Sequence, residues 1–239
     1  ARTGELFEDF IGFYGNGLEE LNFSEIEKSI SAWAETLSIK VNVKNERDVY
    51  SGPVLFLGQA SCELFFQIFG KGVSGVRQPI IENEMLERNL PKQHYGILAN
   101  RLNKRILPEF ISAYDDPNLK AYNNTPLIGG FSIDEEGVKS ERVEIVKDGK
   151  LISFLMSKTP VNKIRETNGH ARYCDEIYGS RYIGLVGNLI LQSKQKTPEP
   201  VLIEKLKALA KDYGNDYAII ITRLQTTVPT SPMARFRRL

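Results

Sequence analysis

Residues 141–157 read ERVEIVKDGKLISFLMS, and this stretch predicts a β-hairpin. Two runs rich in β-branched and apolar residues flank Asp148-Gly149, a pair that favours a type I′ turn because both residues tolerate positive φ. A second turn, Asp134-Glu-Glu-Gly137, comes shortly before the hairpin. Residues 126–157 are therefore predicted to form a β-meander, the basis of an antiparallel sheet.

Short strands and a few helices are predicted on both sides of the meander. Glycine within a strand pattern indicates a bulge or a close backbone approach, and Gly187 is such a residue. Strands and helices do not alternate regularly, so the sequence predicts an α+β fold with a large, mainly antiparallel (mixed) sheet and flanking helices. The predicted strands cover residues 54–56, 110–114, 184–192 and 217–222, and the predicted helices cover 24–37, 60–69 and a segment from residue 200 to Gly214.

The composition is that of an ordinary globular protein, with 41% hydrophobic and 26% charged residues among 239. A net charge of +1 gives no electrostatic reason to expect nucleic acid or an anionic membrane. No apolar run approaches the roughly 18 residues of a membrane-spanning helix. Two cysteines, Cys62 and Cys174, are too few for a disulfide framework. A cytoplasmic location is expected, and an exported form is the alternative because the sequence opens at Ala1.

Several segments, in order, resemble the C-terminal domain of the TldD/PmbA (TldE) family, which comprises candidate zinc metalloproteases also labelled modulators of DNA gyrase. The resemblance extends over most of residues 50–192. It divides the chain into residues 1–49, a helical lead-in or remnant of an N-terminal domain, and residues 50–239, a C-terminal domain shorter than that of a full family member. The segments are YSGPVLFLGQA (50–60), LPEFISAYDDP (107–117), PLIGGFSIDEEGVKSERVEIVKDGKLISFLMSKTP (126–160) and ETNGHAR (166–172).

Zinc-bearing members of this family carry an H-E-x-x-x-H motif on the helix after the PVLF-like strand. Two imidazoles hold the metal, and the glutamate can take a proton from the metal-bound water. Aligned from Pro53 without a gap, the histidine and glutamate positions fall on Phe66, Gln67 and Lys71. None of these side chains can replace its counterpart, so no catalytic residue and no zinc or other cofactor are expected.

The resemblance implies a zinc-less protein closer to the TldE-like partner than to the catalytic subunit. Such a chain would bind peptide or unfolded polypeptide beside a TldD-like, zinc-bearing subunit, in a homo- or hetero-oligomer, and would not act as an enzyme alone. A metallopeptidase with atypical ligands is the alternative. A nucleic-acid modulator is a third reading, favoured only by the basic tail with Arg235, Arg237 and Arg238.

The loop Asn168-Gly169-His170-Ala171-Arg172 offers candidate substrate-binding residues. By resemblance, this loop lies near the cleft of zinc-bearing members, so Arg172 would bind a peptide carboxylate or carbonyl. An ordinary surface turn is an equally good interpretation.

Other groups suggest weaker alternatives. His170 and Cys174, with Asp175 and Glu176 nearby, supply two good metal donors at most. Neither the serines nor His94 belong to a recognisable nucleophile motif, and the DEEG turn needs no calcium to explain it. The serines considered are Ser51, Ser61 and Ser180.

Overall fold

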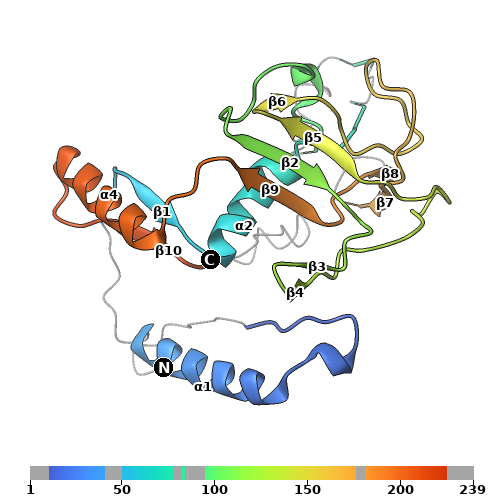
Figure 1. Ribbon diagram of the computed structural model, residues 1–239. Coiled ribbons are helices and arrows are strands. Elements are labelled where there is room, and N and C mark those ends of the chain that lie inside the picture. Colours follow the sequence, from blue (N-terminus) through green and yellow to red (C-terminus); the bar gives the residue numbers. More distant parts are fainter. Residues whose placement is uncertain are drawn as a thin grey trace.

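The computed structural model describes residues 11–40, 50–77, 82–83, 85, 95–175 and 181–224. Its main sheet has four antiparallel strands in the order β6–β5–β2–β9 (Figure 1). The predicted turn joins β5 and β6, and its residues Asp148 and Gly149 have φ values of 49° and 75°. The hairpin prediction is therefore confirmed. The strands are β2 (Ile111–Asp115), β5 (Val143–Lys147), β6 (Lys150–Leu151) and β9 (Leu189–Ser193).

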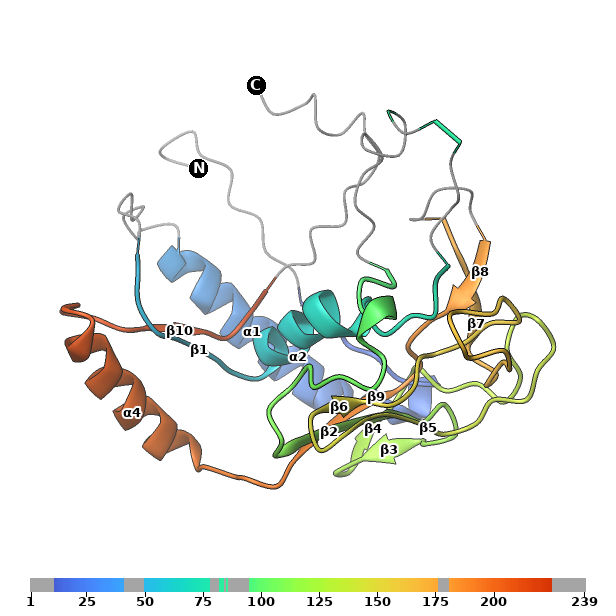
Figure 2. The same cartoon turned by 90° about the horizontal axis from the view of Figure 1, so that it is seen from above.

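The core lies between this sheet and α2 (Gln59–Phe65), which Figure 2 shows against one face of the sheet. Phe69 just beyond α2 is 4% exposed and joins the buried cluster, and Phe65 packs against it. Burial of such apolar side chains is the main favourable contribution to folding. The buried cluster also contains Val73, Ala113, Val143, Ile145, Val146, Leu151, Phe154, Leu155, Met156 and Val161.

A smaller unit combines two parallel strands with helices. β1 (Val54–Phe56) pairs with β10 (Ile219–Ile221), so that Val54 aligns with Ile219 and Phe56 with Ile221. α4 (Glu199–Asp212) precedes β10, and α1 (Phe23–Lys40) lies beyond the other side of β10 (Figure 1). These elements confirm the predicted helices at both ends of the chain, and they make the sheet content mixed as expected.

Two strand predictions need correction. The segment 184–192 is not one strand, because β8 (Arg181–Gly184) ends at Gly184 and β9 begins at Leu189. Between them Gly187 makes the expected close approach: a Cβ there would lie 3.0 Å from the carbonyl oxygen of Gly129. β8 pairs with β7 (Ala171–Cys174) in a separate two-stranded ladder.

The meander predicted for residues 126–157 forms only in part. Residues 127–142 make a single bridge, between Ile133 and Lys139, instead of a strand pair. The reason is the carboxylate of Asp134, which accepts hydrogen bonds from the backbone N–H groups of Glu136 and Val138 and so favours a tight turn over an extended ladder. A short hairpin precedes it, between β3 (Ala121–Tyr122) and β4 (Thr125–Pro126).

The remaining described elements are short. Two 3₁₀ turns, η1 (Leu18–Glu20) and η3 (Ala99–Arg101), lie before α1 and before β2. Within the described residues, no helix combines the length and the apolar character that crossing a membrane requires.

Candidate functional site

The helix that aligns with the family's zinc motif ends in a π-helical turn. α2 runs directly into η2 (Phe66–Gly70), where the N–H of Lys71 donates to the carbonyl oxygen of Phe66 at 3.2 Å. This hydrogen bond spans five residues, whereas an α-helix uses four. Positions 66 and 71 therefore lie one above the other on the same side of the turn. An H-x-x-x-x-H spacing needs this geometry if both side chains are to reach one metal ion.

The side chains on this turn do not fit a zinc ion. Phe66 offers no donor atom, and Lys71 places a cation 5.2 Å from the ring centroid of Tyr95. The amide of Gln67 donates to the carboxylate of Glu63 at 2.7 Å. Zinc requires thiolate, imidazole or carboxylate ligands, so this donor set does not match. Across the described residues, no three His, Cys, Asp or Glu side chains gather as a metal site.

A regular α-helix over residues 60–69 would place Leu64, Phe65, Ile68 and Phe69 on one apolar face, but this face is narrower in the structure. Phe65 and Phe69 point to the core, but Ile68 is 63% exposed and Phe66 is 37% exposed. The extra residue in the π-turn rotates the following positions, so Ile68 leaves the face that an uninterrupted α-helix would give it. The result is an apolar surface on the turn itself.

The loop at residues 168–172 is fastened to its neighbours. The side chain of Asn168 accepts a hydrogen bond from the N–H of Met156 and donates to the carbonyl of Phe154, both at 2.8 Å. Gly169 has a φ of 69°. These contacts give Asn168 and Gly169 internal structural partners. Their proposed role in substrate binding stays a prediction.

His170 is fully buried and bridges two elements. Its Nε2 lies 3.1 Å from Oδ1 of Asp115 on β2, and its Nδ1 lies 3.0 Å from the carbonyl oxygen of Asn168. Both ring nitrogens face oxygen acceptors, so neither is directed toward an empty ligand position. The Asp115 carboxylate also accepts the N–H of Gly187 at 3.1 Å. His170 thus ties the loop to β2 and to the start of β9.

Arg172 is the member of this loop that reaches the surface. Its guanidinium stacks 4.1 Å from the ring centroid of Phe131 and lies 3.7 Å from the carboxylate of Glu135. The other carboxylate oxygen of Glu135 accepts the N–H of Tyr173 at 2.7 Å. The Arg172 side chain is 35% exposed, so its remaining N–H groups are available to a ligand oxygen.

The sequence predicted a turn at Asp134, but it did not show what the carboxylates of Asp115 and Asp134 bind. Asp134 is 5% exposed and accepts the N–H of Ala171 at 3.0 Å in addition to its turn contacts. The side chain of Asn188 similarly joins its own loop to two others. It accepts a hydrogen bond from the N–H of Gly129 and donates to the carbonyl oxygens of Asp116 and Leu119. Asp115 ends β2 and Asn188 precedes β9, so the positions of these two residues beside apolar strands were visible in the sequence, but their distant partners are not encoded locally.

The other candidate residues are dispersed. Cys174 is buried in a second cluster with Val76, Tyr95 and Ile183, and Cys62 is not in a disulfide either. Ser51 and Ser61 lie on either side of β1. The candidates that lie outside the described residues are His94, Glu176, Ser180, Arg235, Arg237 and Arg238.

β9 forms one edge of the main sheet, beside β2, the strand that carries Asp115. Among the residues that the structure describes, Leu189 to Ser193 pair with β2 alone, and Leu189 and Leu191 pack against the same core as Phe69. The N–H of Asp116 donates to the carbonyl of Asn188, and the N–H of Lys194 donates to the carbonyl of Phe110. By the alternation of an antiparallel ladder, the backbone groups of Leu189 and Leu191 point away from β2.

The fold and site together define an α+β domain in which a helix with a π-helical turn packs on a mainly antiparallel sheet. The profile of the PmbA/TldA metallopeptidase C-terminal domain matches residues 51–230, and the chain belongs to this family.

Individual relatives match over shorter stretches. A metalloprotease from Archaeoglobus fulgidus is 40% identical over 76 residues, which are 32% of this chain and 16% of that protein. The metalloprotease PmbA from Escherichia coli O157:H7 is 36% identical over 76 residues, 31% of this chain and 16% of that protein. The chain thus covers less than a fifth of the curated relatives it matches.

Two solved structures are similar at low sequence identity. TldE from Thermococcus kodakarensis is 19% identical, with a TM-score of 0.41 over 63% of this chain and 30% of that chain. A candidate modulator of a DNA gyrase from Thermotoga maritima is 20% identical, with a TM-score of 0.43 over 74% of this chain and 34% of that chain.

Proposed function

We propose that this chain is a non-catalytic, peptide-binding partner of a zinc-bearing metallopeptidase subunit of its own family. The observation that carries the proposal is the π-turn. It keeps positions 66 and 71 on one side, as two metal ligands would require, yet it presents Phe66 and Lys71 there. A subunit with this turn would contribute a wall of the peptide-binding cavity, and its partner would supply the metal.

The outer edge of β9 is our candidate for peptide binding. An extended peptide can add to a sheet edge through main-chain hydrogen bonds, which select for backbone conformation more than for sequence. The outward backbone groups of Leu189 and Leu191 supply such an edge. Arg172 would bind a carboxylate or carbonyl of the same ligand. Peptide or unfolded polypeptide is therefore the proposed ligand, and the cytoplasm is the proposed location, since neither cysteine is in a disulfide.

The test combines metal content with partner capture. The protein is purified without chelators or nickel resin and its zinc is measured by elemental analysis. We expect less than about a tenth of an equivalent, and retention of a co-expressed zinc-bearing family member on the tagged chain. The matched control is the same zinc-bearing protein co-expressed with the tag alone.

The opposite results would support a different function. Close to one equivalent of zinc, together with peptide hydrolysis by the chain alone, would establish a metallopeptidase with atypical ligands. If the protein contained no zinc and also failed to retain the zinc-bearing family member, its proposed role as an assembly partner would be refuted.

A further inference from the structure

The parallel ladder of β1 and β10 has an open outer edge. The carbonyl oxygen of Ile221 accepts the N–H of Leu57 at 2.9 Å, so Ile221 directs its backbone groups toward β1. Ile220, the next residue in the alternation, directs its N–H and C=O toward the opposite side. Nothing in the described part of the chain pairs with β10 on that side.

β10 is more apolar than expected for a strand that is partly exposed to solvent. Three consecutive isoleucines form the strand, a pattern typical of parallel strands buried on both faces. Ile220 is nevertheless 40% exposed. An exposed, apolar, unpaired edge is a template for another strand, and natural proteins normally cover it.

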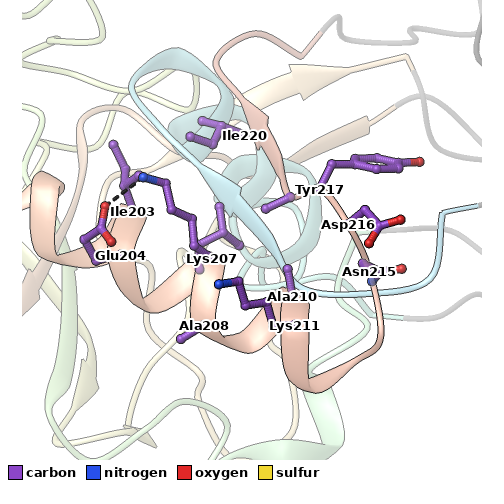
Figure 3. Close-up of a pocket in the computed structure, with 12 residues that line it drawn as sticks. Ile203, Glu204, Lys207, Ala208, Ala210, Lys211, Asn215, Asp216, Tyr217 and Ile220 are labelled. Carbon is purple, nitrogen blue, oxygen red and sulfur yellow. Dashed lines mark hydrogen bonds and ion pairs between the residues drawn. The ribbon is translucent and has the colours of Figure 1, made fainter.

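Two cavities flank this edge. One, of about 600 Å³, lies between α4 and the chain from Asn215 to Ile220, as Figure 3 shows. The other, of about 660 Å³, lies between α1 and β10 and includes Trp33 and Ile221. Ile220 lines both cavities, so the open edge of β10 forms the floor of a groove with α4 on one side and α1 on the other.

A buried donor in the groove also lacks a partner. Nε1 of Trp33 is shielded from solvent and makes no hydrogen bond within the described structure. An unsatisfied buried N–H costs about 1–3 kcal/mol, so a ligand carbonyl that reached this nitrogen after the indole turned toward the cavity would recover that cost. The donor and the edge are independent observations, and a polypeptide backbone, which carries both N–H and C=O groups, can satisfy both.

We propose that the groove binds an extended, apolar polypeptide segment of a partner protein as a third strand beside β10. Such a segment would pair its backbone with Ile220 and offer a carbonyl oxygen to Trp33. Around the α4 cavity, the charges of Glu204 and Asp216 balance those of Lys207 and Lys211, which suits an uncharged segment. A single extended chain fits this recessed edge better than a second copy of the protein, whose own edge is enclosed by the same two helices.

A direct test uses a synthetic peptide with the sequence of residues 216–223, DYAIIITR, as an apolar extended probe with charged ends. The chain contains a single tryptophan, Trp33, and the peptide contains none. The indole fluorescence therefore reports binding at the groove. We expect a saturable blue shift with this peptide. The same peptide N-methylated at the positions equivalent to Ile219, Ile220 and Ile221 should bind at least about tenfold more weakly, because it loses N–H donors on both of its edges.

Variants locate the binding. Ile220→Pro removes the outward N–H and leaves the pairing of Ile219 and Ile221 with β1 intact, and Ile220→Lys places a charge on the edge. Both should weaken binding about tenfold or more. Val201→Lys, on an exposed part of α4 that lines neither cavity, is the matched control and should bind like wild type. Circular dichroism melts establish that each variant is folded.

Three outcomes would overturn the proposal. They are equal affinity for the methylated and unmethylated peptides, unchanged binding by folded Ile220→Pro and Ile220→Lys, and a homodimer in light scattering that Ile220→Lys dissociates. The proposal does not rest on the proposed function. Peptide binding at β9 and capture of a zinc-bearing relative can fail while the β10 groove still binds, and the reverse also holds.

Discussion

His170 and Asp115 form a fully buried contact, with Nε2 and Oδ1 3.1 Å apart, although 55 residues separate them in the chain. This contact joins the 168–172 loop to the main sheet. The contact also explains why the 168–172 loop, which consists largely of polar and small residues, is held in place next to Arg172.

His170→Ala should destabilise the protein by about 3 kcal/mol, because it leaves a buried carboxylate with one partner fewer. Asp115→Asn keeps an acceptor for the Gly187 N–H and should cost less. Urea denaturation measures both through the midpoint and slope of the transition. A loss below about 0.5 kcal/mol for His170→Ala would show that the contact is not stabilising.

Arg172→Ala should weaken peptide binding severalfold while changing the free energy of unfolding by less than about 1 kcal/mol, because the side chain is partly exposed. Arg172→Lys keeps the charge but loses the planar stack on Phe131, so it should restore binding only in part. Asn168→Ala is the contrasting variant. It loses two internal hydrogen bonds and should cost about 2 kcal/mol of stability. Isothermal titration with peptide and urea denaturation separate the two effects, and equal destabilisation by Arg172→Ala would contradict the assignment.

The π-turn can be tested by building a metal site on it. The double variant Phe66→His, Lys71→His places two imidazoles five residues apart, which the π-turn aligns. It should bind zinc at least about tenfold more tightly than wild type. The matched control, Gln67→His with Lys71→His, has the four-residue spacing suited to an α-helix. Zinc titration monitored with a competing chelator would refute the π-turn if the control bound more tightly.

Asp148 and Lys194 give the hairpin a pH-dependent contact. A hydrogen bond from Lys194, whose Nζ lies 2.8 Å from Oδ1, lowers the pKa of Asp148, and the same bond raises the pKa of Lys194. The contribution to stability is therefore present above the unfolded pKa of aspartate, about 3.9, and is lost as pH falls through the lower folded value.

Asp148→Asn isolates this effect, since asparagine also tolerates the positive φ of the turn. The variant should melt slightly below wild type at neutral pH, and the two melting temperatures should converge as pH falls below about 4. Thermal melts across this range measure the difference. A constant difference at all pH values would show that the lost charge is not its cause.

Most of the fold could be predicted from signals that are local in the sequence. The Asp148-Gly149 turn, the helices and the apolar strands were predictable because their causes lie within a few residues. The gap between β8 and β9 was not, since the Gly187 N–H is drawn to Asp115, 72 residues away. The π-turn at Phe66 escaped prediction because apolar spacing in η2 fits an α-helix equally well. For the candidate site, the residue types were visible in the sequence, but the pairing of His170 with Asp115 depends on tertiary packing.

The side chain of Gln59 closes the ladder of β1 and β10 by exchanging two hydrogen bonds with the backbone of Leu224, at 3.0 and 2.9 Å, across 165 residues. Contacts so distant in sequence carry a large entropic cost of loop closure, so they form late in folding. The ladder should thus assemble after the hairpin of β5 and β6. It should also be among the first regions to exchange its amide hydrogens with solvent.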